Sequence, residues 1–218
     1  MSNIWDLRAR LYDVCEASSI RRGKAKAALF REMKGRVLFV AIGTGVDIPH
    51  FPAGRHIVAV DISKEMLRRA AVRRATYAGV LELIEADTMN LGYPDSSFDT
   101  VVTSCTMCSV PDPVRALREL YRVLRPGGTI LMFEHVRSRN HILGLTLDLM
   151  TLWTRRAGTE MNRDTIGSVR KAGFQISRIE SIYLDIILAI HARKPGSAKS
   201  PAGGDLPCVN SSFELWES

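Results

Sequence analysis

Two acids and a glycine turn are the residues of this sequence best placed to bind a ligand. Gly43-Thr44-Gly45 directly follows an apolar run, and Asp61 and Asp87 each end a later one. Glycines after a buried strand let backbone N–H groups approach a ligand closely. A carboxylate at Asp61 is placed to accept both hydroxyls of a ribose, and Asp87 to accept from an exocyclic adenine amine. Together the three features predict a nucleoside pocket.

A purely structural role for the two acids is the alternative. Asp61 would then cap a helix and Asp87 would lie in a turn. The pocket is favoured because strand ends in a doubly wound sheet line one crevice, where the strand order reverses. Both acids and the glycine turn would meet at that crevice.

The elements that must position these residues follow from the alternation of short apolar runs with longer segments. Runs that are apolar almost throughout are typical of parallel strands covered by helices on both faces. A closing hairpin over 174–183 and 186–192 adds one antiparallel strand at or near the sheet edge. The fold class is therefore α/β. The other expected strands are 37–42, 56–60, 81–86, 98–103 and 129–133.

Capping and terminating residues predict where the helices between these strands begin and end. Ser and Asp are preferred before the first helical residue, and proline suits the first turn. Glycine and proline end a helix. The expected helices are 64–77 after Ser63, a helix from Asp112-Pro113 to Pro126-Gly127-Gly128, and 164–172 before Gly173.

The two ends of the chain differ in composition from the alternating region. Residues 1–34 look helical and basic and are expected to form an N-terminal lid. Residues 35–194 are expected to form the main domain, with a helical insertion on the substrate side at about 137–163. Residues 195–218 are rich in Pro, Gly and Ser, which predicts a flexible tail.

The composition sets broad limits on function. A chain of 218 residues and 24.2 kDa is the size of one domain with a tail. Hydrophobic residues at 46% and charged residues at 24% exclude wholesale disorder. No apolar run approaches the roughly 20 residues that span a bilayer, and the N-terminus has no signal-peptide core, so we expect a cytoplasmic protein. A formal charge of +7 favours anionic partners without choosing among them.

The four cysteines are too few and too scattered to form a disulfide framework. Cys105 and Cys108 make a single CxxC motif. A zinc site would need two more ligands, so we expect core or pocket-lining thiols and no metal site.

The motifs between about residues 37 and 194 resemble those of class I S-adenosylmethionine-dependent methyltransferases. VLFVAIGTG is similar to the family's first motif, VAVDIS to its second, LIEADTMNLGYPDSSFDTVV to its third and fourth, and LRPGGTILMFEH to the stretch through the fifth strand. The resemblance implies a Rossmann-like, doubly wound sheet of seven strands in the order 3-2-1-4-5-7-6. Strand seven would be antiparallel, helices would cover both faces, and S-adenosylmethionine would be the cofactor.

The resemblance also implies which positions contact the cofactor. The glycine turn would face its methionine and ribose part, Asp61 would hold the ribose hydroxyls and Asp87 the adenine amine. Residues just past the fourth strand would lie near the methionine end. The implied cofactor-binding residues are Ala41, Gly43, Thr44, Gly45, Asp61, Ile62, Asp87, Thr88, Met89, Ser104 and Cys105.

His135 is the titratable residue best placed to remove a proton from a methyl acceptor, because it comes just after the fifth predicted strand. Tyr12 is the second expected catalytic residue, since Tyr12-Asp13 resembles the start of a lid helix in one subgroup of the family. His50 is a further candidate. A histidine at a strand end is often structural, so both roles stay open for His135.

A closer resemblance is to bacterial phosphatidylethanolamine N-methyltransferases, quinone-biosynthesis methyltransferases and membrane-associated alkyl thiol methyltransferases. It rests on the segments GTGVDIPHFP, CSVPDP and EHVRS. The resemblance implies a small hydrophobic or lipid-like acceptor, such as a phospholipid amine, a quinone precursor or a thiol. The Asn/Asp-Pro-Pro-aromatic signature of enzymes that methylate nucleic acid amines is missing, so no nucleic acid partner is expected.

The run ILGLTLDLMTLW over residues 142–153 is apolar and has arginines on both sides. Its length suits a core or interfacial helix better than a membrane-spanning one. Flanking arginines suit contact with anionic headgroups, which predicts peripheral contact with an anionic membrane. A plain helix that covers the active site is an equal alternative.

Two other functions remain open at this point. A nicotinamide-dependent oxidoreductase shares the Rossmann sheet, but Ile48 stands where the third glycine of GxGxxG would be. A non-catalytic S-adenosylmethionine-binding protein is suggested by Phe39 and Ala41. The family usually has an acid and a glycine at these two positions.

Overall fold

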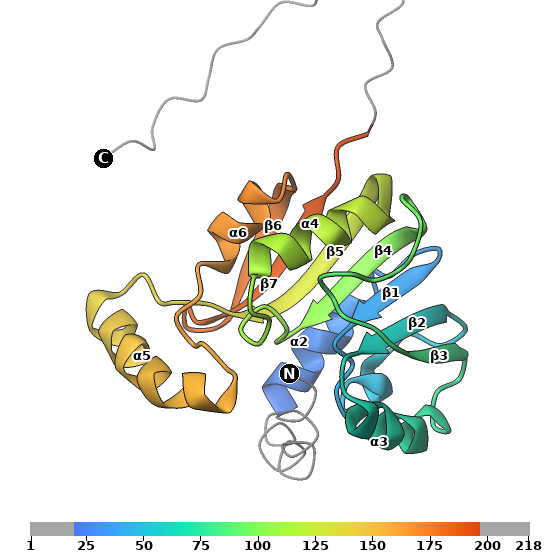
Figure 1. Ribbon diagram of the computed structural model, residues 1–218, viewed down its shortest axis with the longest axis horizontal. Helices are drawn as coiled ribbons and strands as arrows, with labels where there is room; N and C mark the ends of the chain where they lie inside the picture. The colour runs from blue at the N-terminus through green and yellow to red at the C-terminus, as the bar shows by residue number, and fades with distance from the viewer. Residues whose placement is uncertain (1–19, 197–218) are drawn as a thin grey trace, which may run out of the picture.

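The structure, a computed structural model that describes residues 20–196, is a seven-stranded sheet between two layers of helices (Figure 1). The strand order is β3-β2-β1-β4-β5-β7-β6, and β7 runs antiparallel to both neighbours. The predicted fold class, strand order and antiparallel strand are therefore confirmed. The strands are β1 (Val37–Val40), β2 (His56–Asp61), β3 (Val80–Glu85), β4 (Phe98–Ser104), β5 (Leu124–His135), β6 (Gln175–Tyr183) and β7 (Ile187–Arg193).

Helices cover both faces of the sheet, and each face has its own apolar core. One face packs against α4 (Pro113–Val123) and α6 (Thr165–Lys171). The other packs against α2 (Ile20–Phe30), the 3₁₀ helix η1 (Ile48–His50) and α3 (Lys64–Arg74). The central strands are buried on both sides, which is why they read as continuous apolar runs.

The helices begin at the predicted caps. The Ser63 hydroxyl accepts from the backbone N–H of Met66 at 3.1 Å, and the Asp112 carboxylate accepts from that of Arg115 at 2.9 Å. Asp164 caps α6 in the same way. Each cap satisfies an N–H group that has no partner within its helix.

One helix ends earlier than the sequence predicts. α3 ends at Arg74 rather than near residue 77. The Tyr77 hydroxyl donates to the carbonyl oxygens of Pro52 and Arg55, at 2.9 and 3.1 Å. These contacts hold Tyr77 against the loop before β2, which is incompatible with another turn of helix.

The start of β5 also differs from the prediction. α4 ends at Val123, before Pro126 is reached, and Leu124 already pairs with Phe98 of β4. Leu124 is fully buried in the core on the α4 face. Because Leu124 pairs with Phe98 and its side chain is buried in this core, β5 begins at Leu124 rather than at residue 129.

α2 packs on the sheet through a cluster of aromatic rings. The Phe30 ring lies 5.6 Å from that of Phe39 and 5.7 Å from that of Phe51, both in edge-to-face geometry. Phe39 is fully buried and points into this core. At this position the chain therefore buries an apolar ring where the resembled family usually carries an acid.

α5 (His141–Thr154) continues into the 3₁₀ helix η2 (Arg155–Ala157) and stands beside the two helix layers, at the left of Figure 1. Residues 1–19 and 197–218 lie outside the described residues, so the N-terminal lid, its Tyr12 and the C-terminal tail stay predictions. Across residues 20–196, no helix combines the length and the apolar character needed to cross a bilayer.

Candidate functional site

The carboxyl ends of β1, β2 and β4 lie at one edge of the sheet, where the strand order changes direction. From β1 the chain order runs outward through β2 to β3, and from β4 it runs the other way. Open α/β sheets bind ligands at this switch point. The glycine turn follows β1, Asp61 ends β2 and Ser104 ends β4.

The turn after β1 needs its glycines. Gly43 and Gly45 have φ angles of +59° and +83°, which L side chains rarely adopt. A Cβ on Gly45 would lie 2.7 Å from the Cδ1 of Ile48 and 3.0 Å from the Cα of Ala70 in α3. The turn therefore packs directly on η1 and α3, with no side chain between.

Asp61 connects this turn to the end of β2. Its Oδ2 accepts from the backbone N–H of Gly43 at 2.8 Å, and its Oδ1 accepts from that of Ser63 at 2.9 Å. The residue is 7% exposed. The carboxylate thus has a structural role, although the residue that caps α3 is Ser63 and not Asp61. A carboxylate offers about four acceptor sites, so these two bonds do not exhaust it.

Asp87 follows β3, whose last residue is Glu85. The backbone N–H of Ala86, the residue before Asp87, donates to the Asp61 carbonyl oxygen at 3.0 Å. This bond connects the segment after β3 to the end of β2. The Asp87 Oδ1 accepts from the backbone N–H of Met89 at 2.8 Å, as in a turn. Thr88 is buried between these two residues.

The segment after β4 contains a buried hydroxyl that suits a polar ligand. Ser104 is buried, and its Oγ makes no hydrogen bond within residues 20–196. Buried hydroxyls without a hydrogen bond are rare in native structures, because buried polar groups usually have a partner. The Ser104 hydroxyl, the glycine turn and the two acids are the groups that could hold an adenosyl cofactor with an amino-acid end.

Two non-glycine residues adopt left-handed backbone angles beside this site. Ala41 directly follows β1 with φ +54°, and Cys105 directly follows β4 with φ +52°. The N–H of Cys105 donates to the Phe133 carbonyl oxygen at 2.7 Å, which stabilises the bend. Residues held in such conformations cluster at functional sites. Both sharp bends turn the chain away from the sheet at the same edge.

Glu134 of β5 is a residue that the sequence analysis missed. It is fully buried, and its oxygens accept from the Thr103 hydroxyl at 2.7 Å and from the N–H groups of Thr106 and Met107 at 3.2 and 3.1 Å. It therefore holds the segment after β4 in place. Burial raises the pKa of Glu134 from 4.5 to about 7, although these hydrogen bonds and the charge of Lys26 oppose the shift. An acid within an apolar strand was the available signal.

Lys26 links α2 to the loop that follows the glycine turn. Its ammonium lies 2.8 Å from the Asp47 carboxylate, and both side chains are nearly inaccessible to solvent. It also lies 5.2 Å from the centroid of the Phe133 ring. Removing one partner of a buried ion pair is strongly destabilising, so this pair fixes α2 on the site edge.

The remaining candidates have distinct environments. His135 is partly buried, and burial lowers the pKa of its ring below the usual value; a backbone hydrogen bond with Met161 opposes this shift. His50 lies under α2, where a Cβ on Gly23 would come 3.0 Å from its ring. Cys108 is buried and donates its thiol to the Cys105 carbonyl oxygen. Within the described residues no cluster of ligands for a metal is found.

Known proteins resemble this chain over part of its length. The family described as "Methyltransferase domain" matches residues 38–132. Phosphatidylethanolamine N-methyltransferase of Cereibacter sphaeroides is 39% identical over 103 residues, which cover 46% of this chain and 51% of the relative. Demethylmenaquinone methyltransferase of Clavibacter sepedonicus is 40% identical over 100 residues, covering 45% and 40%. The chain thus spans about half or less of the length of these relatives.

Solved structures share the fold over most of the chain. The (4+2)-cyclase SpnF superimposes with a TM-score of 0.70 at 20% identity, covering 90% of this chain and 95% of the other. A methyltransferase of Thermotoga maritima gives a TM-score of 0.67 at 21% identity, covering 89% and 100%. Residues 38–132 thus match a methyltransferase domain, and the fold is the one expected for class I S-adenosylmethionine-dependent methyltransferases. The cofactor that this domain implies is S-adenosylmethionine.

We predict that Ala41→Gly stabilises the protein by about 1 kcal/mol, because a left-handed conformation costs an alanine roughly 1–2 kcal/mol and a glycine little. Urea unfolding measures the change. Ala59→Gly in the neighbouring strand β2 is the matched control, and should destabilise the protein by about 1 kcal/mol. Equal losses in the two variants would contradict the strain at Ala41.

We also predict a pH-dependent effect of Glu134→Gln. The raised pKa means that the folded state holds a proton that the unfolded state releases between pH 4.5 and about 7. This contribution to stability is complete below pH 4.5 and is lost as the pH rises through 7. Glutamine does not titrate, so the unfolding free energy of the wild type, taken relative to that of the variant, should fall by up to about 3 kcal/mol between pH 5 and 8. A difference independent of pH would contradict this prediction.

Proposed function

We propose that this protein transfers a methyl group from S-adenosylmethionine to a small hydrophobic or lipid-like acceptor. The observation that carries the proposal is the buried Asp61 carboxylate, hydrogen-bonded to the glycine turn at the switch point of the sheet. This arrangement joins a close backbone approach to an acceptor for ribose hydroxyls, and both are needed to hold an adenosyl group.

The proposed binding residues follow the edge of the sheet from β3 to β4. Asp61 accepts from the ribose hydroxyls, and Asp87 accepts from the adenine amine. The Ser104 hydroxyl serves the amino-acid end, which is supported by its lack of a partner within the described residues. The full proposed set is Ala41, Gly43, Thr44, Gly45, Asp61, Ile62, Asp87, Thr88, Met89, Ser104 and Cys105.

Few side chains are needed for the reaction itself. S-adenosylmethionine supplies, when bound, a methyl carbon on a positively charged sulfur that is a good leaving group. The protein mainly has to align the acceptor and exclude water. We assign proton removal to His135, because its lowered pKa keeps the ring neutral and able to accept a proton at neutral pH. Tyr12, outside the described residues, stays a second candidate.

The acceptor class is supported by two features. The named relatives are a phosphatidylethanolamine and a demethylmenaquinone methyltransferase, whose names both refer to lipid-like compounds. Several large apolar side chains are exposed on α5, which follows the carboxyl end of β5. We therefore propose a phospholipid amine, a quinone precursor or a thiol as acceptor, with peripheral contact between the protein and an anionic membrane.

A non-catalytic or differently reactive protein is the second candidate. SpnF shows that the same fold occurs in a protein described as a cyclase, so the fold alone does not determine the reaction. Position 39 holds an apolar phenylalanine ring, which packs in the core, and therefore lacks the carboxylate that the resembled family usually has there. The nicotinamide alternative is less well supported, because the sheet closes with the antiparallel hairpin β6–β7.

We predict that Asp61→Ala weakens binding of S-adenosylhomocysteine by roughly 100-fold, since two hydrogen bonds to a charged acceptor are lost. Titration calorimetry measures the affinity. Asp112→Ala is the control, because it removes an exposed helix cap that is not among the proposed binding residues and should cost about 1 kcal/mol of stability without changing binding. Wild-type affinity in folded Asp61→Ala would exclude the proposed site.

The second prediction tests the reaction. With S-adenosylmethionine labelled on its methyl group and an extract separated into lipid, aqueous and protein fractions, label should enter the lipid fraction. Label confined to protein or nucleic acid would reject the acceptor class. Absence of transfer by protein that binds S-adenosylhomocysteine would favour the non-catalytic candidate.

The same assay tests His135. His135→Gln should lower kcat by roughly 100-fold while the KM for S-adenosylmethionine stays unchanged. In the wild type, kcat should fall as the pH drops below the lowered pKa of His135. A variant with wild-type kcat and pH profile would leave His135 with a structural role alone.

A further inference from the structure

The outward face of α5 is apolar. Its exposed large side chains include Ile142, at 81% exposure, and Trp153, at 78%. They make up more than half of the exposed large hydrophobic side chains of the described residues. Soluble proteins rarely expose contiguous patches of this kind unless the patch binds something. The face comprises Ile142, Leu145, Leu149, Met150, Leu152 and Trp153.

The inward face of the same helix is comparatively polar. Its buried positions are Gly144, Leu147 and Thr151, with Asp148 half-buried beside them. A surface helix of a globular protein normally turns its apolar side to the core and its polar side to water. α5 has the reverse arrangement, which burial against its own domain does not explain.

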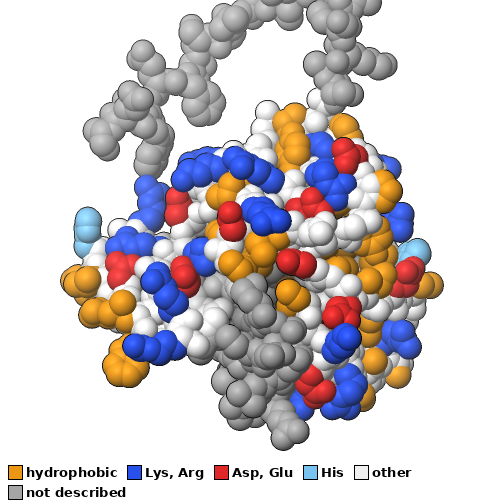
Figure 2. All heavy atoms as spheres, viewed as in Figure 1, with side chains coloured by type: hydrophobic (Ala, Val, Ile, Leu, Met, Phe, Trp, Pro, Cys, Tyr) orange, Lys and Arg blue, Asp and Glu red, His pale blue; other side chains and the backbone are white. Residues whose placement is uncertain are grey.

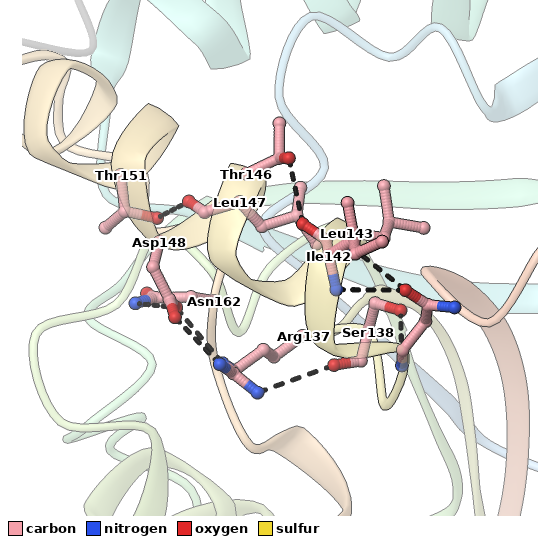
Figure 3. A network of polar contacts seen from close by, with 10 residues as sticks. Arg137, Ser138, Ile142, Leu143, Thr146, Leu147, Asp148, Thr151 and Asn162 are labelled. Atoms are coloured by element: carbon pink, nitrogen blue, oxygen red, sulfur yellow. Dashed lines mark hydrogen bonds and ion pairs between the residues drawn. The ribbon is translucent and has the colours of Figure 1, made fainter.

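Polar contacts hold α5 in this orientation (Figure 3). Arg137 donates to both carboxylate oxygens of Asp148, at 3.0 and 2.7 Å, and the Asn162 amide donates to the same carboxylate at 3.0 Å. The Thr151 hydroxyl accepts from the backbone N–H of Met161 at 3.1 Å. The inward side is thus attached at two successive turns by hydrogen bonds and an ion pair.

The start of α5 is attached to the rest of the domain as well. The Asn140 side chain accepts from the first backbone N–H groups of the helix. Ser138 donates its hydroxyl to Asp185, at 2.7 Å, in the turn between β6 and β7. A Cβ on Gly144 would lie 3.0 Å from the Ser138 carbonyl oxygen, so the helix passes close to this segment. These contacts leave little freedom for the apolar face to rotate inward.

Positive charge borders the apolar face. Arg139 precedes α5 and Arg155 and Arg156 follow it, and all three side chains are exposed. Within residues 20–196, no ion pair is found for Arg139 or Arg156. Figure 2 shows orange hydrophobic and blue basic side chains together over this end of the molecule. Apolar side chains flanked by arginines match the boundary between acyl chains and anionic headgroups.

We propose that the outward face of α5 docks on the surface of an anionic lipid bilayer. At 14 residues the helix is too short to span a bilayer, and it lies in the interface with its arginines at the phosphates. This inference deepens the proposed function. It rests on that function only in explaining why the protein would bind a membrane, which is to bring a membrane-dissolved acceptor to the edge of the site. Binding to lipid itself is measured without any methyl transfer.

The test compares two surface variants of the full chain in a vesicle sedimentation assay. Leu149→Asp on α5 should reduce partitioning onto phosphatidylcholine–phosphatidylglycerol vesicles by roughly tenfold or more. Val72→Asp on α3 is the matched control, because Val72 is also a largely exposed apolar residue on a helix. It should leave partitioning unchanged. Both variants should keep the wild-type melting temperature and affinity for S-adenosylhomocysteine.

Charge and depth are tested separately. Wild-type binding should be weaker on pure phosphatidylcholine vesicles, and Arg156→Gln should reduce binding to the anionic vesicles by about fivefold. In a background of Trp5→Phe and Trp216→Phe, the emission of Trp153 should shift to shorter wavelength on anionic vesicles.

Several outcomes would overturn the proposal. They are no binding to either vesicle, equal loss in Leu149→Asp and Val72→Asp, or no shift of Trp153 emission. Self-association in ultracentrifugation that Leu149→Asp abolishes would instead make α5 an interface between copies of the chain. Lipid binding without methyl transfer would sustain this inference while the proposed function fails, so the two can be distinguished.

Discussion

The bond between the Asp61 carboxylate and the Gly43 N–H is the contact on which the site depends. It ties the first residues after β1 to the last residue of β2, beside one of the two sharp bends at this edge. The same carboxylate holds Ser63, which caps α3. One side chain therefore sets the glycine turn, the end of β2 and the start of α3 together. A ligand that binds here meets groups already ordered by the fold, so less conformational freedom is lost on binding.

Buried ionisable side chains are the second feature that orders this edge of the sheet. Glu134 is buried near the end of β5, and the buried Lys26–Asp47 pair joins α2 to the loop after the glycine turn. A buried charge is costly unless hydrogen bonds or an opposite charge compensate it. Glu134 accepts from Thr103 within β4 and from two N–H groups of the segment after β4, and Asp47 is compensated by Lys26. Because each contact spans distant parts of the sequence, the cost of burial is offset only in the folded arrangement. These groups therefore favour one conformation of the site loops.

Much of the fold could be predicted from the sequence, because its signals are local. Continuous apolar runs predict buried strands, and Ser63 and Asp112 predict helix starts from the residue type alone. What failed depends on distant contacts. The early start of β5 comes from the pairing of Leu124 with Phe98, and the early end of α3 from hydrogen bonds of Tyr77 to the loop before β2.

The candidate site shows the same division. Asp61 and Asp87 were predicted because an acid at a strand end is visible in one short segment. The role of Glu134 was missed, since its partners lie some thirty residues away in the chain and nothing in its own segment names them. The orientation of α5 was also left open between a cover helix and an interfacial helix. Its apolar run is compatible with either orientation, and the outward orientation of the apolar side chains depends on Asp148, which pairs with Arg137 eleven residues before it.

The reversed orientation of α5 has a consequence for how an apolar acceptor would reach the site. A lipid-like molecule that crosses water to a pocket loses its favourable environment for part of the way, which costs about 0.8 kcal/mol for each methylene exposed. α5 starts a few residues after His135, at the carboxyl end of β5, on the same edge as the glycine turn. An apolar surface at this edge shortens the exposed path. The polar anchoring through Asp148 then has a physical reason, because it keeps apolar side chains outward that packing alone would draw into the core.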